Sequence, residues 1–296
     1  MSSAERFGLS VALATPFDSG QRIDAVRAIS HARWCLREGC SSVTLFGTTG
    51  EGASIGTWER DEVLEAFLGA GIPAQRIVAG VMANSVQDAA AQTRRALDAG
   101  CKGVLLAPPS YFKNLDDAGV FAWFAEVIGA LGPCARDIIL YNIPQVTAVA
   151  LSVEVIGRLK AAFPGVATGV KDSAGNWEFT KSLLSAHRDL AILIGDERSL
   201  AAGVRLGGQG AISGMANLCP ARMLGMVEEG RDDPALCAFV DELVKYPVLS
   251  AIKAVLAQRT GDKTWRAARA PLPTLTDTDT GRLVGLFDEM TLARAA

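Results

Sequence analysis

Short apolar runs alternate with longer amphipathic segments along most of the chain. The runs end at turn-forming or polar residues, which is typical of parallel strands buried on both faces. The expected strands cover residues 10–17, 42–46, 76–81, 103–107 and 137–143, a run that holds Lys171, and residues 190–195 and 210–214. The segments between them repeat apolar residues at helical spacing, and the expected helices include residues 24–38, 57–68, 85–99, 116–131 and 152–163.

Eight strand–helix units, spaced by roughly thirty residues, predict a closed (β/α)8 TIM barrel. A doubly wound sheet ranks second, because it needs a switch point and usually has fewer units. After about residue 225 the strand pattern stops, and residues 234–259 and 279–296 look helical, with Pro271-Leu-Pro273 in the loop between them. We therefore expect a catalytic barrel over residues 1–225 and a small C-terminal helical appendage over residues 226–296.

The sixth expected strand ends on a lysine. Lys171 stands in Gly169-Val-Lys-Asp172 and is followed by a Ser-Ala-Gly-Asn turn. The carboxyl ends of barrel strands carry the chemistry in this fold. An ammonium group that loses its hydration favours the neutral amine, which can attack a carbonyl carbon to form a Schiff base. The alternative is a surface lysine at a strand end, paired with Asp172.

Two further strand ends carry polar groups. Gly47-Thr48-Thr49-Gly50-Glu51 follows the second strand, and its hydroxyls and backbone N–H groups can bind a carboxylate. A plain turn is the alternative, and a phosphate cradle would need a lysine after the glycines.

Tyr141 ends the fifth strand. Neighbouring strands lie about 4.8 Å apart, so Tyr141 and Lys171 should be within reach, and a phenol there can move protons. Its alternative is an aromatic ring packed at the barrel end.

Composition narrows the function classes. The net charge of −3 and the pI near 5.6 argue against nucleic acid or an anionic membrane as the main partner. No apolar run approaches the length of a membrane span, and residues 1–6 lack the apolar region of a signal peptide, so we expect a cytoplasmic protein. The two histidines argue against a metal-dependent aldolase. We expect no metal and no cofactor beyond a covalent lysine Schiff base.

Six motifs together resemble the dihydrodipicolinate synthase / N-acetylneuraminate lyase family. Their order and spacing, from Thr15-Pro16 through the last strand, make the resemblance specific. The motifs are Gly47-Thr-Thr-Gly-Glu51, Pro109-Ser-Tyr111, Tyr141-Asn-Ile-Pro144, Gly169-Val-Lys-Asp172, Gly195-Asp-Glu197 and Gly207-Gly-Gln-Gly-Ala-Ile-Ser213.

The resemblance implies a class I aldolase or synthase that handles pyruvate and an aldehyde. Lys171 would form the Schiff base and Tyr141 would relay protons. Thr48 and Thr49 would hold the pyruvate carboxylate, with Thr48 joining the relay. Tyr111 would complete the relay from the neighbouring subunit of a tight dimer within a homotetramer. Gly47 and Ile212 are the remaining expected substrate-binding positions in these motifs.

Two features bear on the second substrate. In dihydrodipicolinate synthases an arginine follows the Tyr-Asn-x-Pro motif and anchors the carboxylate of aspartate semialdehyde, whereas Val146 stands there in this chain. A valine cannot make a bidentate carboxylate pair, so we expect weak binding of that substrate. Asp196, Glu197 and Ser173 match positions that sialic acid lyases use for sugar hydroxyls. An Asp-Glu pair equally suits a capped helix start.

Several functions remain open. The leading hypothesis is a metal-independent lyase that cleaves or forms a carbon–carbon bond next to pyruvate, with a hydroxylated 2-keto-3-deoxy acid as substrate. The alternatives are condensation of pyruvate with aspartate semialdehyde, a Schiff-base dehydratase that retains the carbon count, and a non-catalytic barrel that binds 2-keto acids.

Overall fold

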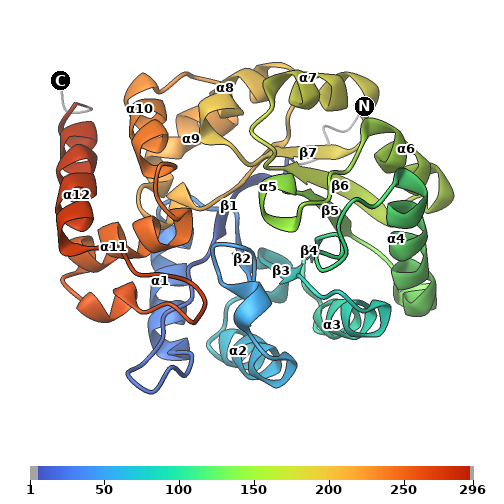
Figure 1. The fold of residues 1–296 in the computed structure, drawn as a ribbon, viewed down its shortest axis with the longest axis horizontal. Coiled ribbons are helices and arrows are strands. Elements are labelled where there is room, and N and C mark those ends of the chain that lie inside the picture. Colours follow the sequence, from blue (N-terminus) through green and yellow to red (C-terminus); the bar gives the residue numbers. More distant parts are fainter. Residues whose placement is uncertain (1–5, 294–296) are drawn as a thin grey trace.

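The structure is a computed structural model that describes residues 6–293. Eight parallel strands form a closed barrel in which each strand pairs with the next and β8 pairs with β1 (Figure 1). The expected (β/α)8 barrel is confirmed, and closure rules out the doubly wound alternative. The strands are β1 (Gly8–Ala12), β2 (Ser42–Leu45), β3 (Ile77–Val81), β4 (Gly103–Leu106), β5 (Ile138–Asn142), β6 (Ala167–Asp172), β7 (Ala191–Ile194) and β8 (Gly210–Ser213).

Helices cover the outside of the barrel, and most of them begin at a residue whose side chain caps the first turn. Asp24, Ser85 and Ser152, for example, each accept a hydrogen bond from a backbone N–H of the first turn. These helices are α1 (Ala25–Arg37), α2 (Thr57–Gly69), α3 (Val86–Asp98), α4 (Asp117–Leu131), α6 (Val153–Ala162), α7 (Trp177–Ala186), α8 (Glu197–Arg205) and α9 (Pro220–Glu229). The short α5 (Pro144–Thr147) directly follows β5 at the carboxyl end of the barrel.

Three more helices follow the barrel, α10 (Pro234–Leu243), α11 (Val248–Thr260) and α12 (Asp277–Leu292). Figure 1 shows α11 and α12 together on one side of the barrel, near α1 and far from α4 and α6. Short 3-10 turns complete the chain, η1 (Gly52–Ser54), η2 (Ala74–Arg76), η3 (Gly132–Cys134), η4 (Met215–Asn217) and η5 (Lys263–Arg266). No helix within residues 6–293 is long and apolar enough to cross a membrane.

Successive side chains of a strand point to opposite faces of the sheet. The buried apolar side chains therefore form two separate clusters, one on each face. The larger cluster lies between strands and helices and includes Val170 of β6. The smaller one fills the barrel interior, with Ala12, Val78, Leu105, Ala107, Ile139, Tyr141, Ile143, Leu193 and Ile212. Tyr141 therefore points into the barrel, and Lys171, next to the outward-facing Val170, points the same way.

Four boundaries differ from the expected ones. The first strand ends at Ala12, not near residue 17, because Phe17 instead makes an isolated antiparallel bridge with Ile23. The helix expected over residues 234–259 is two helices, α10 and α11, interrupted before Pro247, which starts α11 as its N-cap. Helix α9 spans residue 225, where we expected the barrel to end. The last expected helix stops at Leu292, and residues 294–296 lie outside the described residues.

Candidate active site

Lys171 and Tyr141 occupy paired positions on neighbouring strands. They are direct register partners of β6 and β5. Both side chains are buried, with 6% of Lys171 and 1% of Tyr141 exposed. Lys171 Nζ donates a hydrogen bond to the Tyr141 hydroxyl at 3.3 Å. The pairing puts an amine and a phenol in contact inside the carboxyl end of the barrel.

Asp172 faces away from Lys171 and does not pair with it. Its carboxylate accepts hydrogen bonds from Asn142 Nδ2 at 2.9 Å and from Thr180 Oγ1 at 2.6 Å, on the helix side of the sheet. The alternative of a surface lysine paired with Asp172 is therefore wrong. Asp172 instead ties β5, β6 and α7 together behind the lysine, which fixes the strand that carries it.

The turn after β2 brings a hydroxyl to the same place. Thr48 Oγ1 lies 3.2 Å from the Tyr141 hydroxyl. The turn is closed by the Glu51 and Gly52 N–H groups, which donate to the Thr48 and Gly47 carbonyls at 3.1 and 3.0 Å. A Cβ on Gly52 would lie 1.8 Å from the carbonyl oxygen of Phe46, so only glycine allows this closure. The Thr48-Thr49 segment is thus presented by a tightly constrained backbone.

Ser173 and Asp196 lie on neighbouring loops after β6 and β7. A Cβ on Gly195 would lie 2.0 Å from Ser173 Oγ, and one on Gly175 would lie 3.5 Å from Asp196 Oδ2. Asp196 caps α8, accepting from the Arg198 backbone N–H at 3.0 Å, and also forms an ion pair with the Arg198 guanidinium. The capped helix start is therefore present, and Asp196 Oδ2 also lies beside the turn that follows Ser173.

Glu197 is placed differently from Asp196. Its Oε1 accepts a hydrogen bond from Ser213 Oγ, and Ser213 also contacts Met223 of α9. Because Ile212 points into the barrel, Ser213 points toward the helices, and Glu197 is buried there with it. Burial raises the pKa of the Glu197 carboxyl. Ile212 itself lies in the interior cluster with Tyr141 and Leu193.

Tyr111 and Val146 are exposed on the carboxyl-end loops, with 75% and 57% of their surfaces accessible. The Tyr111 backbone N–H donates to Asn84 Oδ1 at 2.9 Å, which fixes the loop, and its ring packs edge-on against Phe112. Val146 lies in the short helix α5, directly after β5. Within residues 6–293 no hydrogen bond joins the Tyr111 hydroxyl to Thr48 or Tyr141.

A buried ion pair near the Thr48-Thr49 turn was not expected from the sequence. Lys253 Nζ of α11 donates to Glu51 Oε1, and both side chains are essentially inaccessible to solvent. The two residues are 202 positions apart. A lysine inside an apolar helical segment is the one signal that could have pointed to it, because a buried ammonium needs a partner.

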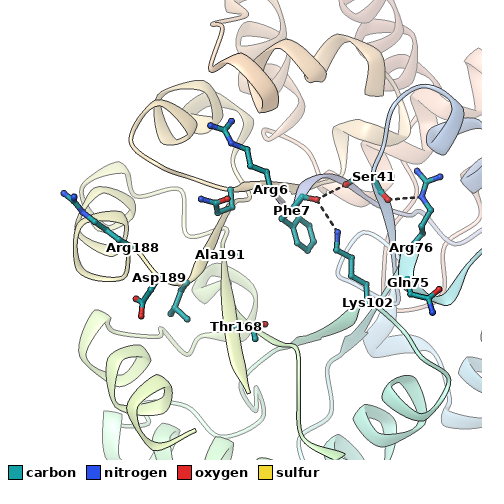
Figure 2. Close-up of a pocket in the computed structure, with 12 residues that line it drawn as sticks. Arg6, Phe7, Ser41, Gln75, Arg76, Lys102, Thr168, Arg188, Asp189 and Ala191 are labelled. Atoms are coloured by element: carbon teal, nitrogen blue, oxygen red, sulfur yellow. Dashed lines mark hydrogen bonds between the residues drawn. The ribbon is translucent and has the colours of Figure 1, made fainter. Parts of the chain in front are cut away.

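A cavity of about 990 Å³ opens at the opposite end of the barrel (Figure 2). Its cationic side chains bond to the backbone. Lys102 Nζ donates to the Phe7 carbonyl at 3.4 Å, and Arg76 Nε donates to the Ser41 carbonyl at 3.0 Å. The Lys102 ammonium also lies over the Phe7 ring, 4.5 Å from its centre. The amine–phenol–hydroxyl arrangement therefore belongs to the carboxyl end of the barrel.

Neither histidine lies in this arrangement. His31 Nε2 lies 3.2 Å from Asn217 Oδ1, and His187 Nε2 lies 3.0 Å from the Val153 carbonyl oxygen. Over residues 6–293, no group of three or more His, Cys, Asp and Glu side chains is arranged to hold a metal ion. The groups that meet at the carboxyl end of the barrel include an amine, a phenol and a hydroxyl.

The fold and this site define a class, the barrel enzymes with a buried lysine at the end of the sixth strand. Residues 5–287 match the model of the dihydrodipicolinate synthetase family. The chain belongs to this family, whose members are lyases and synthases of the aldolase type.

Relatives and solved structures agree with this assignment. An uncharacterized DapA-like lyase of Chloroflexus aurantiacus is 32% identical, covering 97% of this chain and 98% of its own. A 4-hydroxy-tetrahydrodipicolinate synthase of Salinibacter ruber is 33% identical over 76% of this chain and 74% of its own. The crystal structure of a dihydrodipicolinate synthase from Agrobacterium tumefaciens is 55% identical, with a TM-score of 0.95, covering 96% of this chain and 99% of that chain.

Proposed function

We propose that the protein is a class I lyase in which Lys171 forms a Schiff base with the keto group of pyruvate or of a pyruvate-containing substrate. The observation that carries this proposal is the hydrogen-bonded row of Lys171 Nζ, Tyr141 OH and Thr48 Oγ1. The amine provides the nucleophile, and the phenol can give a proton to the carbonyl oxygen or take one from it. No metal ion or other cofactor enters this chemistry.

In the cleavage direction, the neutral Lys171 amine attacks C2 of the substrate. The carbonyl oxygen takes one proton from the amine and one from Tyr141 and leaves as water, so Tyr141 becomes a phenolate that can act as a base. The resulting iminium carbon is an electron sink. Tyr141 takes the proton of the C4 hydroxyl, the C3–C4 bond breaks, and its electron pair forms an enamine while the aldehyde leaves. Protonation of C3 and hydrolysis of the imine then release pyruvate. Thr48, hydrogen-bonded to Tyr141, extends the path that carries these protons.

The substrate carboxylate would bind at the turn after β2. Thr48 and Thr49 offer two hydroxyls, and the Gly47-Thr48-Thr49 backbone adds N–H donors in a compact turn. Such a turn binds an anion without a full positive charge, so Lys171 is not needed as the counter-ion of the carboxylate. Ile212 would supply an apolar wall, since it lies in the interior cluster with Tyr141.

Tyr111 would complete the proton relay of a neighbouring subunit in a homotetramer built from two tight dimers. Its high exposure supports this placement, because an aromatic side chain that is 75% exposed gains most from burial against a partner. Phe112, which packs against it, is 69% exposed and would belong to the same interface.

A hydroxylated 2-keto-3-deoxy acid is the substrate class that the rim supports best. Val146 offers no charge to a second carboxylate. Ser173 and Asp196 lie on adjoining loops and can bond to hydroxyl groups of a neutral aldehyde. Glu197 takes no part in this proposal, because its carboxylate is bonded to Ser213 on the helix side of β8.

Condensation of pyruvate with aspartate semialdehyde is the second candidate. The relatives named 4-hydroxy-tetrahydrodipicolinate synthase and dihydrodipicolinate synthase favour it. Product analysis separates the candidates. Incubation with a panel of 2-keto-3-deoxy acids should release pyruvate and an aldehyde, and Lys171→Met should abolish the release. A 2-keto acid with all carbons retained would indicate a dehydratase, and no turnover of any compound would indicate a binding barrel.

A further inference from the structure

The carboxylate of Glu51 is bonded on both oxygens by the C-terminal region. Lys253 of α11 donates to Oε1, and the Arg269 backbone N–H donates to Oε2 at 2.8 Å. Lys253 also donates to the Ala267 carbonyl, and its ammonium lies 4.6 Å from the centre of the Phe17 ring. With 0% of the Glu51 side chain and 1% of the Lys253 side chain exposed, the pair is sealed from water.

Glu51 belongs to the turn that carries Thr48 and Thr49. Its backbone has a φ of 56°, in the left-handed region, and its N–H donates to the Thr48 carbonyl at 3.1 Å. A non-glycine residue in that region is strained, so surrounding contacts must hold it. The ion pair supplies such a contact one residue after Gly50, within the backbone that would bind the substrate carboxylate.

Helix α11 reaches the same turn at a second point. A Cβ on Gly214 would lie 2.7 Å from Ile252 Cδ1 and 3.2 Å from Thr49 Oγ1. Ile252 and Thr49 therefore converge on the same small space beside β8, and Ile252 precedes Lys253 in the helix. One turn of α11 thus reaches the space beside Thr49 with Ile252 and bonds to Glu51 with Lys253.

Stability alone explains such a pair poorly. Burying two charges has a large desolvation cost, and an apolar pair of similar size often stabilises a fold as well or better. A buried ion pair with hydrogen bonds on every oxygen does fix geometry, because its partners cannot shift without losing those bonds. Misplacing a binding group by about 1 Å can reduce activity by roughly 10²-fold.

We propose that Glu51 and Lys253 are positioning residues that hold the Thr48-Thr49 turn in the geometry that binds the substrate carboxylate. Helix α11, outside the barrel, is then a functional element of the active site. This inference rests on the proposed function, because it needs a substrate carboxylate at that turn. The reaction proposed above uses only barrel residues, and this inference gives a C-terminal helix a role in it as well.

The test measures how borohydride trapping on Lys171 depends on the concentration of pyruvate, and of acetone, which has the ketone but no carboxylate. Lys253→Met removes the cation while keeping an unbranched side chain. We expect the pyruvate concentration for half-maximal trapping to rise by about 10- to 100-fold, the range for residues that orient a binding group. Acetone trapping should change by less than about twofold, because acetone does not use the carboxylate site.

Two further variants separate positioning from stability. Arg222→Met breaks another largely buried ion pair, with Asp233, that joins α9 to the start of α10. It should lower the melting temperature without changing pyruvate trapping. Lys253→Met combined with Glu51→Gln leaves no stranded charge, so its melting temperature should recover while the pyruvate concentration for half-maximal trapping stays raised. The double variant also carries the test if Lys253→Met alone does not fold.

Unchanged half-saturation by pyruvate in the folded double variant would overturn the positioning role. An equal loss for pyruvate and acetone would also overturn it, because that pattern indicates a general disturbance of the barrel. Wild-type protein that forms no adduct would refute the proposed function itself and this inference with it. Wild-type trapping combined with unaffected variants would refute the positioning role alone.

Discussion

Tyr141 and Lys171 are register partners on β5 and β6, and the Lys171 amine donates to the Tyr141 hydroxyl at 3.3 Å. The contact follows from the parallel register, since both residues stand near the carboxyl ends of adjacent strands and point into the barrel. Thr48 approaches the same phenol from β2 at 3.2 Å. The phenol thus contacts both the expected nucleophile and the expected carboxylate-binding turn.

Removing the phenol hydroxyl tests the relay. We expect Tyr141→Phe to keep the ring's packing while kcat falls by about 10²–10⁴, the typical contribution of a positioned acid–base group. Steady-state kinetics of pyruvate release measures this, with circular dichroism to verify the fold. Tyr246→Phe, a matched change near the junction of α10 and α11, should leave kcat unchanged. A folded Tyr141→Phe variant with near-normal kcat would make the tyrosine purely structural.

Val146 tests the choice of aldehyde. The semialdehyde brings a carboxylate that would be desolvated with little compensation in the wild type. Val146→Arg should raise kcat/KM for condensation of pyruvate with aspartate semialdehyde by about 10- to 100-fold, as a charge-assisted hydrogen bond of about 1.5–3 kcal/mol would. Val146→Gln, similar in length but uncharged, is the control. Efficient semialdehyde condensation by the wild type would show that another group binds this carboxylate and would favour the synthase assignment.

Mixing two inactive variants tests whether Tyr111 acts across a subunit interface. Tyr111→Phe keeps Lys171, and Lys171→Met keeps Tyr111. If Tyr111 serves the neighbouring subunit, a mixed dimer contains one site with both groups intact. Subunits refolded together should then recover a substantial part of the wild-type activity, whereas each variant alone stays inactive. Failure to recover activity in verified mixed oligomers would place Tyr111 in its own subunit's site or outside the chemistry.

The burial of His31 should make the free energy of unfolding fall as the pH is lowered. Burial against Trp34 and Trp265 lowers its pKa to about 4, despite the opposing hydrogen bond with Asn217. The unfolded chain takes up the proton near pH 6.5, so it binds more protons than the folded chain between pH 6.5 and about 4. The contribution of neutral His31 is therefore complete above pH 6.5 and is lost as the pH falls toward 4, by about 3 kcal/mol in the free energy of unfolding.

Urea unfolding of the wild type and of His31→Gln at several pH values between 4 and 6.5 measures this difference. Glutamine can still donate to Asn217 but does not titrate. We expect a smaller fall in the free energy of unfolding for the variant over this interval than for the wild type. Parallel curves for wild type and His31→Gln would show that His31 is protonated in the folded protein.

The barrel could be predicted from the sequence because its signals are local. A strand buried on both faces is a short apolar run, and a barrel helix is a capped amphipathic segment, so residues 57–68 and 116–131 matched α2 and α4 closely. The first strand was overestimated because the apolar composition continues past Ala12. The chain leaves the barrel there, with the Ala14 N–H bonded to Asn217 Oδ1 at 3.0 Å, a contact that local sequence does not reveal.

The contact between Tyr141 and Lys171 could be predicted from the sequence in the same way. Strand order and spacing bring Tyr141 and Lys171 together, because residues at the ends of adjacent parallel strands must be neighbours. Glu197 is bonded to Ser213 of β8, so its orientation depends on which residues of β8 face the helices. Ile212 faces the barrel interior, and Ser213 faces outward. The Lys253–Glu51 pair depends on how the C-terminal helices dock against the barrel. Contacts of that kind need the tertiary structure.

The central claim is that Lys171 becomes covalently bound to the keto carbon of pyruvate. Incubation with pyruvate and sodium borohydride, followed by peptide mass spectrometry, tests it most directly, because hydride reduces the imine to a stable secondary amine. We predict one reduced pyruvyl group on Lys171, no adduct without pyruvate, and none in Lys171→Arg, which keeps the charge but has no nucleophilic amine. An unmodified Lys171, or a specific adduct on Lys102 at the other end of the barrel, would contradict the account.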